Sequence, residues 1–276
     1  EVPYLMLMTV AALGQVKSHE IMAAARSLGY SPASAWLKTV FPQVYPQIRL
    51  PVYAVLAFSL SVVDVSVILA PTNPPPLSTL VFRMFMDRDL SMVFPASAGA
   101  CLQFIMVALC IMLWRLAETA VYKGARGWLT AGRRSGCLRG AAGLWIGMFA
   151  VIVVLSGLGS VAMALWSFTE SWFYPRAIPP VWTLGNWARH LGGLLWPGKV
   201  TMVAGLCTAF LALVLAVGCL QNERIKGLGA TSRALWLLYV PLLVPQIAFL
   251  FGVQVILVKF NLDGTWSALV LCHLLF

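Results

Sequence analysis

One acidic residue, Asp64, lies deep inside an apolar stretch of the chain, within the run Ser-Val-Val-Asp-Val-Ser at residues 61–66. A carboxylate at the centre of a bilayer costs about 2.5–3.5 kcal/mol on insertion scales, so it should face other helices or a water-filled path. Two interpretations stay open. Asp64 lines the route of a substrate through the membrane, or it is hydrogen-bonded to neighbouring serine or backbone groups near the outer surface.

Two further acids, Asp87 and Asp89, flank Arg88 and could act as a catalytic pair. Acid–base catalysis needs carboxylates that converge on one reacting group. No histidine or other acid stands near them in the sequence. We therefore expect the pair to lie on the solvated face of a short outer helix.

The remaining chemistry-bearing residues are scattered. The three histidines, His19, His190 and His273, have no metal-ligand spacing, and none of the six cysteines forms a Cys-x-x-Cys pair, which favours free thiols. The sequence has no Gly-x-x-x-x-Gly-Lys-Ser/Thr loop for nucleotide phosphates and no Gly-x-Ser-x-Gly nucleophile motif. These patterns predict no metal, no cofactor and no enzymatic reaction carried out by this chain.

The composition is that of a membrane protein. Hydrophobic residues make up 61% of the 276 and charged residues only 10%, whereas soluble domains carry about 25% charged residues. Apolar runs of about 20 residues, enough to cross a bilayer as a helix, recur along the chain. We predict an all-α polytopic protein with complete spans at 47–70, 94–116, 141–167, 200–220 and 235–258. Partial spans at 2–13 and from residue 265 suggest a fragment of a longer protein.

The net charge of +10 follows the predicted topology. Thirteen of the nineteen Lys and Arg residues fall in the stretches 14–49, 115–140 and 221–234. Because basic residues concentrate on the cytoplasmic side, these stretches should lie inside the cell. The charge therefore predicts contact with the anionic headgroups of a bilayer and no binding of nucleic acid.

The segment 18–42, which the charge places in the cytoplasm, has the pattern of two helices joined by a sharp turn. Ser18 can cap the first helix, Gly29 can adopt the left-handed conformation that ends it, and Ser31 and Pro32 can begin the second. Pro42 is expected to stop that second helix. The alanines between Met22 and Arg26 have almost no side-chain bulk, so another protein could approach this segment closely.

This pattern resembles the EAA loop of bacterial ABC-type import permeases. That motif is Glu-Ala-Ala, three residues, Gly, nine residues, Ile, one residue and Leu-Pro. The corresponding residues here are Ala23, Ala24, Ala25, Gly29, Thr39, Phe41 and Pro42. Ala23 replaces the glutamate, Thr39 the isoleucine and Phe41 the leucine, while the spacing is intact. The resemblance implies that Ala23, Ala24, Ala25, Gly29, Phe41 and Pro42 couple the chain to a cytoplasmic ATPase.

The resemblance extends to nearly the whole chain and implies the fold of type I ABC importer permeases. Residues 1–117 correspond to the C-terminal part of a first permease half, 118–140 to a basic cytoplasmic linker, and 141–276 to the N-terminal part of a second half. This order is similar to fused permeases of the thiamine and ferric-iron type. A second such loop is expected to begin soon after Phe276.

The resemblance implies a permease subunit of an ATP-driven importer in the bacterial inner membrane. A periplasmic binding protein would deliver a small solute, and separate ATPase subunits would hydrolyse ATP. A secondary active transporter is the alternative. Such proteins often carry several buried ionisable residues at the middle of the membrane, whereas this sequence offers only Asp64 for that role. A polytopic enzyme that processes lipids is a third possibility, for which only Asp87 and Asp89 are candidate acids.

Overall fold

The computed structural model describes residues 1–71, 73–132, 134, 141–173, 175–176, 178–227 and 246–275. In this part of the chain the regular elements are helices, apart from a single β-bridge between Thr169 and Trp182. The predicted all-α class is confirmed. Four stretches are helical, long and apolar enough to cross a membrane, and they are Pro32–Leu69, Leu90–Thr130, Gly143–Ser167 and Gly185–Lys226.

The described chain separates into two compact units, one formed by Glu1–Ser135 with Leu211–Phe276 and the other by Gly136–Phe210. The first unit contains most of the elements. They are α1 (Val2–Gln15), α2 (Ser18–Ser27), α3 (Pro32–Ala35), the π-helical turn Trp36–Val40, α4 (Phe41–Ser61), α5 (Asp64–Leu69), α6 (Leu77–Phe85), the 3-10 turn Leu90–Met92, α7 (Val93–Thr130), α11 (Gln246–Lys259) and α12 (Trp266–Leu274).

The second unit contains α8 (Ala141–Ser167) and the N-terminal part of α9 (Gly185–Lys226). Helix α8 coincides with the predicted span 141–167. Helix α9 contains the predicted span 200–220 but begins earlier, at Gly185. The predicted span 235–258 lies partly outside the described residues, and α11 accounts for its second half.

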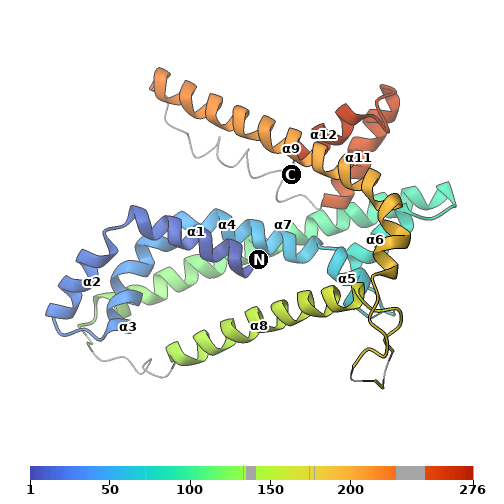
Figure 1. The fold of residues 1–276 in the computed structure, drawn as a ribbon. Coiled ribbons are helices and arrows are strands. Elements are labelled where there is room, and N and C mark those ends of the chain that lie inside the picture. The colour runs from blue at the N-terminus through green and yellow to red at the C-terminus, as the bar shows by residue number, and fades with distance from the viewer. Residues whose placement is uncertain are drawn as a thin grey trace. The chain divides into compact units, whose positions relative to one another are not determined.

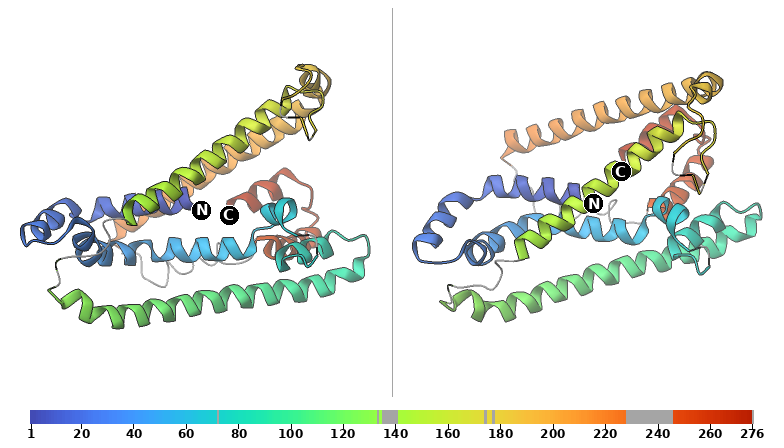
Figure 2. Two further views of the ribbon diagram at one scale, coloured as in Figure 1. Left: turned by 90° about the horizontal axis from the view of Figure 1, so that it is seen from below. Right: turned by 60° about the horizontal axis from the view of Figure 1, so that its bottom comes forward.

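Helices α1, α4 and α7 run side by side in the first unit (Figures 1 and 2). Helices α2 and α3 lie at one end of this group, and α5 and α6 lie at the other. Because α4 has 21 residues and a helix rises 1.5 Å per residue, its two ends are about 31 Å apart. The 18–42 segment and Asp64 are therefore at opposite ends of α4.

Helix α7 is longer than the predicted span 94–116. It has 38 residues and continues to Thr130, so the first part of the predicted linker 118–140 is helical. Seven of the fourteen residues from Ala117 to Thr130 are Ala, Glu, Lys, Arg or Leu, which are strong helix formers, and this explains why the helix continues beyond the apolar run. The linker residues 133 and 135–140 lie outside the described part of the chain.

A close approach between α6 and α7 depends on Gly99. A Cβ atom added at Gly99 would lie 2.8 Å from Cγ2 of Val81, which is itself 1% exposed. Real Cβ atoms do not approach other atoms so closely, and Val81 is stiff because it is β-branched. The absence of a side chain at Gly99 therefore permits this helix pair to pack.

We expect Gly99→Ala to destabilise the protein by about 1–3 kcal/mol, because overpacking outweighs the gain of about 1 kcal/mol in helix propensity. The measurement is the thermal unfolding midpoint in detergent. Gly124→Ala is the matched control, since Gly124 also lies in α7 and a Cβ there meets nothing within 4 Å. Equal midpoints for the two variants would contradict this account.

Candidate functional site

The turn between α2 and α3 in the 18–42 segment has the predicted local structure, and we call its residues Gly29, Tyr30 and Ser31 the corner. Gly29 has a φ of +86°, and its N–H donates to the carbonyl of Arg26 at 2.9 Å, while the N–H of Tyr30 donates to that of Ala25 at 3.2 Å. These bonds satisfy carbonyls left free at the end of α2. The hydroxyl of Ser31 accepts from the N–H of Ser34 at 3.3 Å and caps α3. Gly29 and Ser31 thus fix the turn.

Two predictions about the boundaries of this segment are wrong. Lys17 rather than Ser18 is the N-cap of α2, and no side chain caps that end. Pro42 does not stop the second helix, because α3 continues through the π-helical turn Trp36–Val40 into α4. Pro42 lies in the first turn of α4.

The alanines of α2 divide between its surface and its interior. Ala23 and Ala24 are exposed, whereas Ala25 is 5% exposed. The exposed face also carries Leu28, which is 61% exposed, and Glu20. Glu20 pairs with Lys17 at 3.5 Å, but both side chains are more than 70% exposed, so this pair contributes little stability. We call Glu20, Ala23, Ala24 and Leu28 the α2 face.

A hydrophobic cluster fixes the 18–42 segment to the neighbouring helices. Its buried members are Ala12, Val40, Val44 and Ile48, and Ile21, Met22 and Trp36 pack against them. The ring of Phe41 lies 5.4 Å from that of Trp36 and 5.5 Å from that of Tyr45. Phe41 therefore helps to hold the start of α4, although 36% of its surface is exposed.

The end of α7 contacts the 18–42 segment through Lys38. Its Nζ donates to the carbonyl of Ala131 at 2.7 Å and lies 4.8 Å from the ring centroid of Trp128 and 5.6 Å from that of Tyr30. These cation–π geometries each contribute about 0.5–1 kcal/mol at exposed sites. Lys38 thus joins a residue next to the corner, Tyr30, to the end of a helix far away in sequence.

A second contact lies beside the corner itself. The N–H of Ser31 donates to the carbonyl of Arg134 at 3.1 Å. A Cβ atom added at Gly29 would lie 3.6 Å from Cδ and 3.8 Å from Nη1 of Arg134. Arg134 therefore lies beside the turn at Gly29, although Gly29 itself is exposed, as the α2 face is.

At the opposite end of α4, Asp64 follows a break in the helix. Helix α4 ends at Ser61 and α5 begins at Asp64. The carbonyl of Val62 accepts from the hydroxyl of Ser78 at 3.1 Å, and that of Leu60 accepts from Nε2 of Gln103 at 3.4 Å. Asp64 is exposed and makes no hydrogen bond or ion pair with any residue that the structure describes. A role of Asp64 in a substrate path stays a prediction.

The acid pair Asp87 and Asp89 follows α6 instead of lying on it. Both residues are exposed. Asp87 accepts from the N–H of Asp89 at 3.0 Å, and Asp89 accepts from that of Ser91 at 2.9 Å. The backbone N–H and the hydroxyl of Ser91 lower the pKa of Asp89. Asp89 caps the turn Leu90–Met92, and neither acid lies in a helix, so the prediction of a helical position was wrong, whereas the predicted exposure is correct.

The structure records free thiols for Cys101, Cys110, Cys207, Cys219 and Cys272, and Cys137 lies outside the described residues. Within the described ranges, no three side chains of His, Cys, Asp or Glu are grouped as metal ligands would be. The cysteines thus play no part in a described disulfide or metal site.

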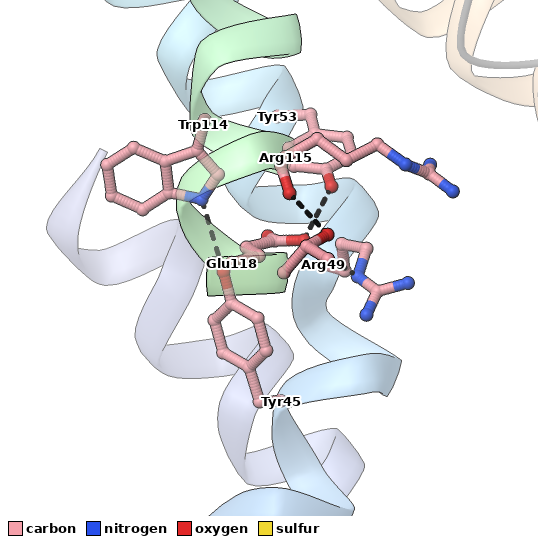
Figure 3. A network of polar contacts seen from close by, with 7 residues as sticks. Tyr45, Arg49, Tyr53, Trp114, Arg115 and Glu118 are labelled. Carbon is pink, nitrogen blue, oxygen red and sulfur yellow. Dashed lines mark hydrogen bonds and ion pairs between the residues drawn. The ribbon is translucent and has the colours of Figure 1, made fainter. Parts of the chain in front are cut away.

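A polar cluster that the sequence analysis missed joins α4 to α7 (Figure 3). Glu118 on α7 accepts from the hydroxyl of Tyr45 at 2.5 Å and from that of Tyr53 at 2.9 Å. The Nε of Arg49 lies 3.2 Å from Oε2 of Glu118, as an ion pair without hydrogen-bond geometry. Trp114 Nε1 donates to the hydroxyl of Tyr45 at 3.1 Å. We call these five residues the Glu118 cluster.

The comparisons with known proteins bear on the whole chain. No protein-family model matches it, and no solved structure matches it. The chain is 28% identical over 251 residues to the inner membrane ABC transporter permease protein YnjC of Escherichia coli (strain K12). The alignment covers 90% of this chain but 42% of YnjC, so the chain spans less than half the length of this relative.

Together with its long apolar helices, this similarity confirms the predicted location of the chain as a multi-pass protein of the bacterial inner membrane. The predicted resemblance is confirmed as well: over nine tenths of its length, the chain is similar to an ABC transporter permease.

Proposed function

We propose that this chain is part of the permease subunit of an ATP-driven ABC importer, and that the 18–42 segment couples it to the ATPase. The similarity to a permease supports the transport class. The observation that carries the coupling role is the exposed α2 face, whose small residues Ala23 and Ala24 stand at a corner fixed by Gly29. A partner protein can approach the backbone closely there.

The proposed mechanism is a rigid-body movement. The ATPase receives the α2 face in a groove, and closure of the ATPase pair moves the segment. Because α3, the π-helical turn and α4 follow one another without a break, α4 tilts with the segment. The spans then expose the substrate path alternately to the two sides of the membrane.

The sites at the two ends of α4 have different proposed partners. A periplasmic binding protein delivers a small solute to the stretches 71–93 and 168–199, which lie outside if the basic stretches lie in the cytoplasm and the spans alternate. Asp64 lines the path that follows. The residues proposed to act in coupling are Ala23, Ala24, Ala25, Gly29, Phe41 and Pro42. Of these, Ala25 supports α2 from the inside, because it is buried.

The coupling role is tested by Ala24→Trp in the full-length protein. The large ring blocks close approach to the α2 face, so co-purification of the ATPase and stimulated ATP hydrolysis should both fall at least about tenfold, which corresponds to about 1.4 kcal/mol of binding free energy. Ala120→Trp is the matched control, since Ala120 is an exposed alanine on α7. It should leave both quantities unchanged.

Equal loss in the two variants, or loss in neither, would contradict the proposed docking face. Cargo uptake that continues without any ATPase would favour the alternative of a secondary transporter. Activity on lipids in place of uptake would favour a lipid-processing enzyme.

A further inference from the structure

The Glu118 cluster joins one face of α4 to one face of α7. Tyr45, Arg49 and Tyr53 are spaced four residues apart in α4, and Trp114 and Glu118 are four apart in α7. Residues four apart lie above one another on a helix. Three successive turns of α4 therefore contact a single carboxylate of α7, as Figure 3 shows.

The electrostatics of the cluster make this contact stronger than an ordinary surface pair. The side chain of Glu118 is 11% exposed, so its charge is removed from most of the surrounding water. Two hydroxyl donors and the Arg49 guanidinium compensate for that loss. Hydrogen bonds to an ionised acceptor are about twice as strong as neutral ones, and removal of one partner would leave a buried charge uncompensated.

The position of the cluster gives it a mechanical consequence. Helix α4 continues from the 18–42 segment, so a movement of that segment reaches α4 through the backbone. Helix α7 is separated from the segment by fifty residues of sequence and contacts it directly at its far end, through Lys38, Trp128 and Ala131. On α4 the Glu118 cluster extends from Tyr45 to Tyr53, between the 18–42 segment and the end of the helix at Ser61. It thus connects α7 to the part of α4 that moves first.

We propose that Glu118 is a positioning residue that makes α7 move together with α4. The 18–42 segment then drives two spans instead of one. This inference rests on the proposed coupling function, but the α4–α7 connection itself can be measured without the ATPase. This role of Glu118 could not be inferred from the composition of the chain or from the motif of the 18–42 segment.

The test uses the full-length permease with its native cysteines replaced and spin labels at Phe58→Cys on α4 and Leu102→Cys on α7, both exposed positions away from the cluster. With Glu118 intact, the distance between the labels should be narrowly distributed and equal with and without ATP in the complex with the ATPase. In Glu118→Gln the distribution should broaden and change with ATP. The ATP hydrolysed per cargo imported should rise about tenfold, within the range of coupling free energies between sites.

Glu223→Gln is the control for loss of a carboxylate, because Glu223 lies on α9, outside the cluster and outside the stretches proposed to act in coupling or to receive the solute. It should behave as the wild type. If Glu118→Gln does not fold, the double variant Tyr45→Phe and Tyr53→Phe keeps the ion pair, removes both hydroxyl donors and should give the same broadening.

An unchanged distance distribution and an unchanged ATP requirement in a folded variant would overturn the role of Glu118. Failure of the wild-type protein to bind an ATPase would instead overturn the proposed function. In that case the label distances without ATP still show whether Glu118 holds α7 to α4, so the two failures are distinguishable.

Discussion

Gly29→Val should abolish stimulated ATP hydrolysis while the protein still inserts into the membrane. Gly29 has a φ of +86°, and this region costs a residue with a Cβ about 1–2 kcal/mol, more for a β-branched one. The Cβ itself would meet only Arg134, at 3.6 Å or more. The expected cause is therefore backbone strain that turns the α2 face, and not a steric clash within the chain.

The measurement is co-purification of the ATPase together with hydrolysis in the full-length complex, and both should fall together. Gly29→Asn is the matched variant, because asparagine visits the left-handed region more readily than other residues with a side chain. It should retain most of the activity. If Gly29→Val couples as well as the wild type, the corner is not part of the coupling element.

Lys38→Met should release the end of α7 from the 18–42 segment. The change removes the hydrogen bond to the Ala131 carbonyl and both ring contacts, while the methionine keeps much of the apolar stem. A hydrogen bond and a cation–π contact contribute about 1 kcal/mol each, so local opening should become at least about tenfold more frequent. Limited trypsin digestion of the solubilised protein should cleave after Arg134 correspondingly faster.

Lys38→Arg keeps a cation between the rings and should restore a slow rate of cleavage. Faster cleavage at all Lys and Arg sites of Lys38→Met would indicate general unfolding. Cleavage after Arg134 at the wild-type rate would show that Lys38 does not hold this part of the chain.

The corner at Gly29 could be predicted because its signals are local. A glycine that ends one helix, a serine that caps the next and a proline in its first turn act over a few residues. The prediction for Pro42 was wrong because a proline is equally compatible with the first turn of a new helix. Sequence alone does not distinguish a proline that follows one helix from a proline that begins another without a gap.

The Glu118 cluster and the contacts of Lys38 could not be predicted, because they join residues far apart in sequence. The spacing of Tyr45, Arg49 and Tyr53 is a usable signal, since it places three side chains with polar groups on one face of α4. Glu118 was assigned to a linker because basic residues and glycines follow it. The break before Asp64 was also missed, since the carbonyls it frees are satisfied by Ser78 and Gln103 from other helices.

The bond between Lys38 and Ala131 spans 93 residues of sequence, and this separation imposes an order on biosynthesis. Ribosomes add about 5–20 residues per second, so Ala131 is made roughly 5–20 s after Lys38. During that interval the nascent 18–42 segment is present without the end of α7 that later holds it. The segment therefore gains these contacts only after α7 is complete, and a pause of the ribosome between these residues would lengthen the interval.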